Sequence, residues 1–155
     1  MIDVGVEPYE RLSNFHPYHF LFRGVECGSM EGLLQSLKFP LPEKQMKVAK
    51  LVGLKAKRVG KKKKWFIDHK LYWQGEPICR FSEEYKLFLL EAFTALFEQS
   101  EQFRTELLKT GTEQLIHSVG KKSEKFTVLT EDEFVSILSE LRERVTGTVF
   151  VKQEG

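Results

Sequence analysis

Apolar residues recur at helical spacing directly after Ser29, whose hydroxyl can accept hydrogen bonds from the free N–H groups of a first turn. A helix is therefore predicted to begin at Met30. Pro40 and Pro42 end it, because proline has no N–H to donate and clashes with the preceding turn. The apolar positions of this helix are Met30, Leu33, Leu34 and Leu37.

Four later segments also have the pattern of helices. A short one ends at Gly53, a residue typical of helix C-termini. A wide apolar stripe after Ser82 predicts a central core helix, and Phe103 belongs to the helix that follows it. Thr130 and Glu133 have the spacing of a capping box, which predicts the start of a last helix.

Two hairpins and one further strand are predicted. Gly24 offers a turn after the aromatic stretch YHFLF, and Gly75 lies between two apolar runs with Trp73 close to the turn. The stretch TGTVFV, residues 146–151, is expected to form an edge strand. The sequence thus predicts an α+β fold, mostly helical with a few short strands.

The chain has 155 residues and 41% hydrophobic content, which suits one core and one domain over residues 1–155. Its 24 Lys and Arg residues oppose 22 Asp and Glu residues, so its net charge of +2 does not by itself indicate nucleic acid. We see no signal peptide, no C-x-x-C pair and no apolar run of the roughly 20 residues that a bilayer requires. A cytoplasmic protein without a membrane span is expected.

The segment KAKRVGKKKK, residues 55–64, is the sharpest local change of charge. It is interpreted as a mixture of two cases, a solvated loop and a segment that attracts the phosphate of a ligand. One short patch offers few simultaneous contacts to duplex DNA. No H-E-x-x-H motif, Cys/His cluster or complete phosphate-binding loop is found, so neither a metal nor a cofactor is expected.

Glu31, Gln35 and Lys38 are spaced by four and three residues, which places them together on one face of the first helix. The simplest interpretation is a solvated polar stripe, worth about 0.2–0.5 kcal/mol for each pair. The alternative is a set of functional groups beside a buried helix.

Several motifs in a fixed order favour the functional alternative. They are LSNF at residues 12–15, the aromatic hairpin, MEGLLQSLKF, AKRVGKKKK, LYWQG and LLKTG. In this order the chain resembles the NADAR family, also called YbiA-like, from about Leu12 to His117. Met30, Glu31, Gln35 and Lys38 fall on the central family motif V-E-H-x-x-Q-x-x-K, with Gly32 in place of its histidine.

Two further segments match the family less closely. Its A-x-x-L-G-R segment corresponds to Ala56, Val59, Gly60 and Lys61, and its acidic ending is replaced by LIHSVGKKSEKFTVLT. This ending resembles that of a subgroup in which His117 and Ser118 follow the matched part and in which Trp73, Arg80 and Tyr85 recur.

The resemblance implies an N-glycosidase, which hydrolyses the bond between the anomeric carbon of a ribose and a nitrogen. Its implied substrates are phosphorylated ribosylamino intermediates of riboflavin synthesis or ADP-ribosylated guanine, as a nucleotide or in nucleic acid. Such a reaction passes through an oxocarbenium-like centre, which requires a carboxylate nearby, and Glu31 is the first candidate. Lys38 either binds phosphate or attacks the anomeric carbon as a neutral amine.

The resemblance also implies several substrate-binding residues, each with a structural alternative. Trp73 could stack on a base or belong to the core, and Asn14 could bind ribose hydroxyls or the base edge. Lys61 and Arg80 suit a phosphate but are common in surface ion pairs. The remaining candidates are Gln35, Ser118 and His117. His117 could donate to the leaving group or be a structural histidine at a helix end.

Two other classes of function compete with an enzyme. A module that binds ADP-ribose without cleaving it would use the same pocket, and Glu31 argues against that class. A nucleic-acid-binding domain would use the basic segment on phosphates and Trp65 or Trp73 on unstacked bases. The sequence does not indicate an oligomeric state.

Overall fold

The computed structural model describes the backbone of residues 1–154 and the side chains of residues 1–145. Most of its elements begin or end at the polar caps and turns predicted from the sequence. Ser29 caps α1 by accepting the N–H of Gly32 at 3.0 Å. Ser82 and Ser100 cap the next two long segments in the same way. These helices are α1 (Met30–Ser36), α4 (Glu83–Gln99) and α5 (Glu101–Leu108).

Both predicted hairpins are confirmed, and each has a two-residue turn. Arg23 and Gly24 have φ angles of 49° and 80°, and Gln74 and Gly75 have φ angles of 49° and 88°. Such left-handed pairs match the twist of antiparallel strands, which explains the glycine in each turn. The strands are β2 (Phe20–Phe22) with β3 (Val25–Cys27), and β4 (Lys70–Trp73) with β5 (Glu76–Cys79).

The middle of the chain is more helical than predicted. Helix α2 (Pro42–Ala49) ends before Gly53, and Gly53 begins α3 (Gly53–Lys61) rather than ending a helix. Most of the basic segment therefore lies on α3, because Ala56 and Gly60 give this lysine-rich helix a buried side. The 3-10 helix η2 (Trp65–Ile67) follows.

The predicted edge strand at the C-terminus is wrong. The capping box of Thr130 and Glu133 forms as predicted, with N–H to oxygen distances of 2.8 and 3.1 Å. Helix α6 (Glu131–Glu154) then runs through residues 146–151 without a break. Local β-branched residues in this stretch do not prevent a helix that is already nucleated from continuing.

One pairing was not predicted from the sequence. Strand β1 (Ile2–Asp3) lies parallel to β6 (Leu115–Ile116), which brings the N-terminus beside the segment that precedes α6. The 3-10 helix η1 (Glu10–Leu12) then leads the chain toward α1. Helices account for 48% of the residues and strands for 12%, which confirms the predicted α+β class.

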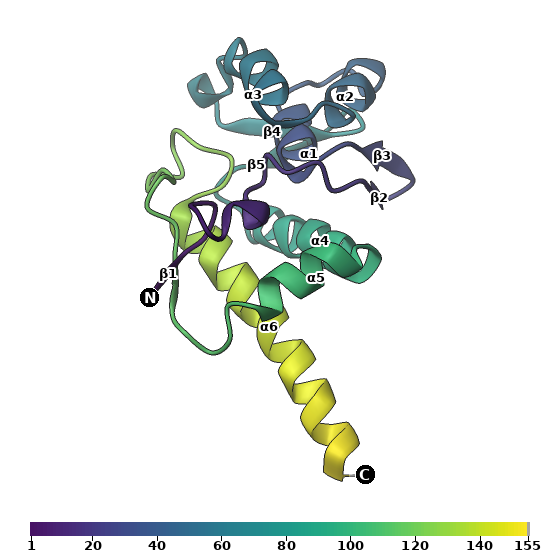
Figure 1. The fold of residues 1–155 in the computed structure, drawn as a ribbon. Coiled ribbons are helices and arrows are strands. Elements are labelled where there is room, and N and C mark those ends of the chain that lie inside the picture. Colours follow the sequence, from purple (N-terminus) through teal and green to yellow (C-terminus); the bar gives the residue numbers. More distant parts are fainter. Residues whose placement is uncertain (155) are drawn as a thin grey trace.

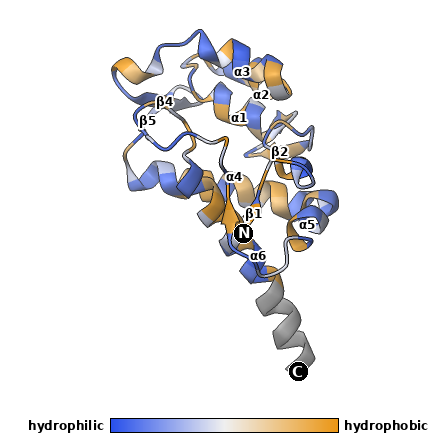
Figure 2. Ribbon diagram, turned by 60° about the vertical axis from the view of Figure 1, so that its left-hand side comes forward, coloured by the Kyte–Doolittle hydropathy of each residue, from blue (hydrophilic) through white to orange (hydrophobic). Residues whose placement is uncertain are grey.

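The elements form two groups with one apolar core between them. Helices α1, α2 and α3 and both hairpins lie in one group, and α4, α5 and α6 lie in the other (Figure 1). Helices α3, α4 and α5 each carry hydrophilic and hydrophobic residues, as expected of helices that cover a core with one side (Figure 2). No helix in the described part of the chain is long and apolar enough to cross a bilayer.

Helix α1 packs unusually close to the backbone that follows α2. A Cβ atom added to Gly32 would lie 2.3 Å from the carbonyl oxygen of Leu51 and 2.5 Å from that of Ala49. Gly28 meets the carbonyl of Lys50 in the same way, at 2.1 Å. The family histidine that Gly32 replaces has no room at this position in this chain.

We predict that Gly32→Ala destabilises the protein by about 1–3 kcal/mol, because the added methyl group must push backbone apart. A loss of stability would be informative, because alanine in a helix is otherwise more stable than glycine by roughly 1 kcal/mol. Chemical denaturation would measure the free energy of unfolding. Gln102→Ala, at an exposed position of α5, should change it by less than about 0.5 kcal/mol, and an equally neutral Gly32→Ala would contradict the prediction.

Candidate functional site

Glu31 lies in the first turn of α1, where its backbone N–H donates to the carbonyl oxygen of Asn14 at 3.0 Å. This bond satisfies one of the free donors of the helix N-terminus and fixes the LSNF segment against the helix. The carboxylate oxygen Oε1 of Glu31 accepts a hydrogen bond from Nε2 of Gln35 at 2.8 Å. The structure thus brings Asn14, Glu31 and Gln35 together.

Gln35 is 7% exposed, and its hydrogen bond holds the carboxylate of Glu31 in place. Its own Oε1 has no hydrogen-bond partner among the described residues and lies against α3. A Cβ atom at Gly60 would come within 1.8 Å of this oxygen. Gly60 therefore allows α3 to lie against the Gln35 amide, which gives the loosely matched family glycine a physical role.

A cleft of about 370 Å³ opens above Glu31. Five segments build it: the LSNF segment, α1, α3, the residues after β6 and the loop before α6. Since these segments lie far apart in the sequence, the cleft depends on the tertiary fold. Its walls include Ser13, Asn14, Phe15, Glu31, Leu34, Gln35, Lys57, His117, Val119, Gly120, Lys121, Thr127, Val128 and Leu129.

The charges around the cleft are one carboxylate and several amines. Lys57 and Lys121 line the cleft, and Lys38 lies in the turn after α1, partly buried. Burial lowers the pKa of Lys38 to about 8, a shift that nearby Glu31 opposes and that Lys121 and Lys57 increase. Burial also raises the pKa of Glu31, against the effects of the Gln35 hydrogen bond and of Lys57 and Lys38.

His117 also lines the cleft and directly follows strand β6. Its Nδ1 lies 2.7 Å from the carbonyl oxygen of Val4, so Nδ1 carries a proton and donates it. The ring also packs edge-on against Phe134, with centroids 4.9 Å apart. A neutral His117 therefore has Nε2 as its acceptor nitrogen.

Ser118 lies outside the cleft lining and anchors its neighbour. Its N–H donates to Oδ1 of Asp3 at 3.0 Å, and its hydroxyl donates to Oδ2 of the same carboxylate. These two bonds lower the pKa of Asp3. In this structure Ser118 therefore links the residues after β6, including His117, to strand β1.

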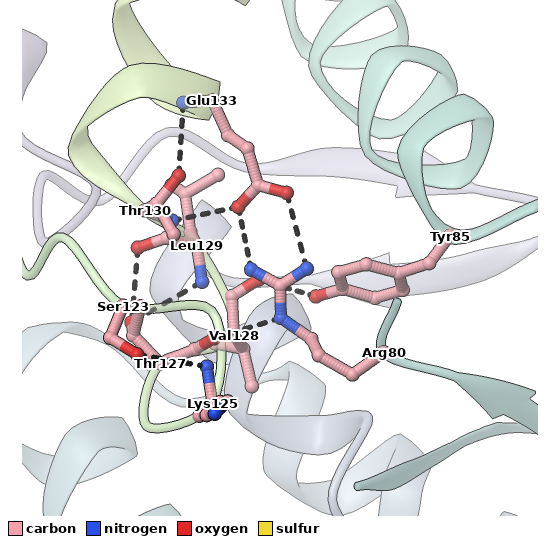
Figure 3. A network of polar contacts seen from close by, with 9 residues as sticks. All are labelled: Arg80, Tyr85, Ser123, Lys125, Thr127, Val128, Leu129, Thr130 and Glu133. Atoms are coloured by element: carbon pink, nitrogen blue, oxygen red, sulfur yellow. Dashed lines mark hydrogen bonds and ion pairs between the residues drawn. The ribbon is translucent and has the colours of Figure 1, made fainter. Parts of the chain in front are cut away.

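Arg80 does not face a ligand, because it is fully buried and its guanidinium is occupied (Figure 3). Its Nε donates to the carbonyl of Thr127 at 2.8 Å, and its two Nη atoms reach the carboxylate of Glu133 at 2.6 and 3.1 Å. It also stacks over Tyr85, whose hydroxyl donates to the carbonyl of Val128 at 2.6 Å. Arg80 therefore holds the cleft wall formed by the loop before α6.

Trp73 and Lys61 also lie away from the cleft. Trp73 packs against Phe22 and Phe88 with ring centroids 5.1 and 5.6 Å away, so its surroundings are those of the core alternative. Lys61 is an exposed residue at the end of α3. A lysine one turn earlier, Lys57, faces the cleft instead.

Phe15 and Lys121 line the cleft but were not proposed as site residues from the sequence. Phe15 is 36% exposed, and its ring lies 5.9 Å from Nζ of Lys57. Phe15 belongs to the LSNF motif, so that motif could have indicated it. Lys121 gives no such signal, because it lies in the segment where the chain departs from the family pattern.

A second cavity of about 470 Å³ lies beside the hairpin of β2 and β3. His19, Glu26, Lys50 and Gln99 are its polar lining residues, and it contains none of the predicted site residues. Within the described side chains no group of three or more His, Cys, Asp or Glu residues could hold a metal ion. The cleft above Glu31 is therefore the better candidate for a functional site.

Comparisons with known proteins identify similar sequences and a similar fold. The family model of bacteriophage protein GP30.3 matches residues 7–143, which include all five segments of the cleft. A 17.1 kDa protein from the Gp30–rIII intergenic region of Enterobacteria phage T4 is 34% identical over 134 residues. That alignment covers 85% of this chain and 88% of the phage T4 protein.

The fold is that of the Escherichia coli protein YbiA, whose NMR structure superimposes with a TM-score of 0.62. The two chains share 18% sequence identity, and the superposition covers 97% of this chain and 89% of YbiA. The resemblance to the YbiA-like proteins that the motifs indicated is thereby confirmed at the level of the fold.

We predict that Glu133→Ala destabilises the protein by about 3–5 kcal/mol, because it leaves the guanidinium of Arg80 buried without its carboxylate partner. Thermal or chemical denaturation would measure the loss. Glu140→Ala is a matched control on the same helix, since Glu140 forms a half-exposed pair with Arg144 and should cost less than about 1 kcal/mol. Equal losses in the two variants would refute a special role for the buried pair.

Proposed function

Because the chain belongs to the bacteriophage GP30.3 family and has the fold of YbiA, we propose that it is an N-glycosidase. Its proposed substrate is a compound in which a phosphorylated ribose is joined to a base or amine through nitrogen. The observation that carries this proposal is the buried carboxylate of Glu31 in the cleft, with the amine of Lys38 near enough for each group to shift the pKa of the other. Burial gives the carboxylate a raised pKa and the amine a lowered pKa, which suits proton transfer near neutral pH.

The surroundings of this pair suit the proposed substrate. Lys57 and Lys121 supply positive charge for a phosphate, in the role first assigned to Lys61 and Arg80. Phe15 presents an exposed ring for stacking on a base, in the role first assigned to Trp73. Asn14 keeps its proposed role at the ribose hydroxyls, since its backbone is bonded to Glu31.

Glu31 acts as the catalytic carboxylate in this scheme. When the bond from the anomeric carbon to nitrogen breaks, positive charge develops on the ribose ring, and an ionised carboxylate beside it lowers the energy of that state. Gln35 keeps the carboxylate oriented through its 2.8 Å hydrogen bond. The raised pKa also makes Glu31 a better proton acceptor than an exposed glutamate.

Lys38 acts as the nucleophile. Its neutral amine attacks the anomeric carbon, the bond from that carbon to the base nitrogen breaks, and the ribose becomes attached to Nζ. Glu31 takes a proton from the attacking amine and delivers it to the leaving nitrogen, so the charge on the pair is restored. The ring then opens to an imine, which water hydrolyses to free sugar and lysine.

The identity of the nitrogen-linked group is the finer part of the proposal. Ribosylamino intermediates of riboflavin synthesis and ADP-ribosylated guanine share the phosphorylated ribose that the cleft lysines suit. Mass spectrometry of the purified protein with a panel of both classes would identify which substrate loses its base. Release of base from no member of the panel would contradict the proposed activity.

We predict that Glu31→Gln lowers kcat by about 10²–10⁴-fold, because an amide can neither accept the proton nor carry the negative charge. Steady-state hydrolysis of the substrate found in the panel would measure this loss. Glu43→Gln makes the same chemical change at an exposed position on α2 and should leave kcat unaltered. A folded Glu31→Gln variant that retains most of its kcat would overturn the assignment.

We predict that kcat rises with pH and levels off above about 8, because attack requires the deprotonated amine of Lys38. Borohydride added during turnover should reduce the imine and leave a sugar adduct on Lys38, visible by peptide mass spectrometry. If Lys38 only binds phosphate, the reaction should instead weaken as the pH rises, because the amine loses its positive charge as the pH passes its pKa. In that case no adduct forms, and Lys38→Ala raises KM with little change in kcat.

A further inference from the structure

We propose that a surface outside the cleft binds single-stranded nucleic acid. This aromatic–lysine surface consists of Phe66, Phe81 and Phe126 with Lys64, Lys122 and Lys125. It goes beyond the proposed hydrolysis, because it requires neither Glu31 nor Lys38. Three segments carry it: η2 with the lysine before it, the residue Phe81 after β5, and the loop before α6. They are separate in the sequence and meet only in the folded chain.

The three phenylalanines are exposed; two of them are ring neighbours, and the third is connected to them through His69. Phe66 is 42% exposed and Phe126 is 61% exposed, and their ring centroids are 6.3 Å apart with the planes tilted by 52°. Phe81 is also 42% exposed, and its ring lies 4.8 Å from that of His69. Nε2 of His69 lies 3.1 Å from the carbonyl oxygen of Lys125, which joins Phe81 to the loop that carries Phe126.

Exposed aromatic rings that lie together are unfavourable in water, so their presence on the surface indicates a binding role. Single exposed apolar residues are ordinary on protein surfaces, but grouped aromatic rings leave a contiguous apolar area in water. The two tryptophans cannot provide the stacking surface expected from the sequence. Trp65 is 7% exposed, and Trp73 packs against Phe22 and Phe88.

The charges beside the rings identify the kind of partner. Lys61–Lys64 lead directly into η2, and Lys122 and Lys125 precede Phe126 in the loop before α6; all six lysines are exposed. Among the described residues none of them forms an ion pair with a carboxylate. Exposed rings between unpaired lysines match a ligand that alternates flat bases with phosphates.

A single strand fits this surface better than a duplex. Stacking on phenylalanine requires a base whose faces are free, and duplex bases are already stacked on one another. The loop that carries Phe126 also supplies residues of the cleft lining, from Val119 to Lys121 and from Thr127 to Leu129.

Fluorescence anisotropy with a labelled oligothymidylate of about 15 nucleotides tests the stacking part of the proposal. The double variant Phe66→Ala/Phe126→Ala should bind roughly tenfold or more weakly than the unaltered protein. The control Leu41→Ala/Leu87→Ala removes two other exposed apolar side chains and should bind within about twofold of it. Equal affinity of the aromatic double variant and this control would overturn the proposal.

The salt dependence of the same binding tests the lysines. Lys122→Gln/Lys125→Gln should reduce the slope of log affinity against log salt by about 1 to 1.5, since each phosphate contact on a single strand contributes about 0.7. Lys47→Gln/Lys86→Gln, at exposed positions on α2 and α4, should leave the slope unchanged. No binding at about 50 mM salt, or equally tight binding of a duplex of matched sequence, would refute the proposal.

Glu31→Gln separates this surface from the proposed reaction. The variant should bind the oligonucleotide like the unaltered protein, because Glu31 lies inside the cleft. Retained hydrolysis in this variant counts only against the glycosidase mechanism. A loss of its oligonucleotide binding counts only against a surface that is independent of the cleft.

Discussion

The close packing of α1 against neighbouring backbone is the constraint on which the site depends. Gly28 and Gly32 let α1 approach the carbonyls of residues 49–51, and the hydroxyl of Ser29 donates to one of these, the carbonyl of Leu51, at 3.0 Å. On the other side, Gly60 lets α3 approach the amide of Gln35. A helix of only seven residues has little stability of its own, so these contacts determine where Glu31 points.

The opposite wall of the cleft is held by polar contacts that are distant in sequence. Arg80 and Tyr85 bind the carbonyls of Thr127 and Val128, while Asp3 binds Ser118 beside His117. The buried carbonyls of a loop without regular structure need such partners, because no helix or sheet hydrogen bonds satisfy them. These residues resemble ligand-binding residues in the sequence, yet their observed contacts are to the protein itself.

Local features of the fold could be predicted from the sequence, and features that depend on distant partners could not. Serine caps, the capping box of Thr130 and two-residue turns have signals within a few residues, and all of them form. The pairing of β1 with β6 joins two strands of two residues each, which are too short to show any alternation. Residues 55–64 were interpreted as a loop because they contain seven lysines and arginines. The apolar side of helix α3 consists of small buried residues, Ala56 and Gly60, which give little hydrophobic pattern in the sequence.

The same limit applies to the candidate site. Glu31, Gln35 and Asn14 were found because a motif places them near one short helix, and the structure puts them side by side. The burial of a charged side chain depends on partners that sequence spacing does not reveal, so Arg80 was interpreted as a phosphate ligand although Glu133 neutralises it. Lys57 and Lys121 could not be distinguished from other surface lysines, because only the closed fold turns them toward Glu31.

Desolvation connects this packing to the proposed chemistry. Burial is the largest cause of both pKa shifts, raising that of Glu31 and lowering that of Lys38, and it brings the proton affinities of the two groups closer together. The neighbouring charges act in the opposite direction on Glu31, since Lys57 and Lys38 both lower its pKa. The proton exchange proposed for Glu31 and Lys38 therefore depends on the protein excluding water from both groups. That exclusion rests on the residues that hold the walls, so Gly60 and Arg80 contribute to the proposed reaction without touching a substrate.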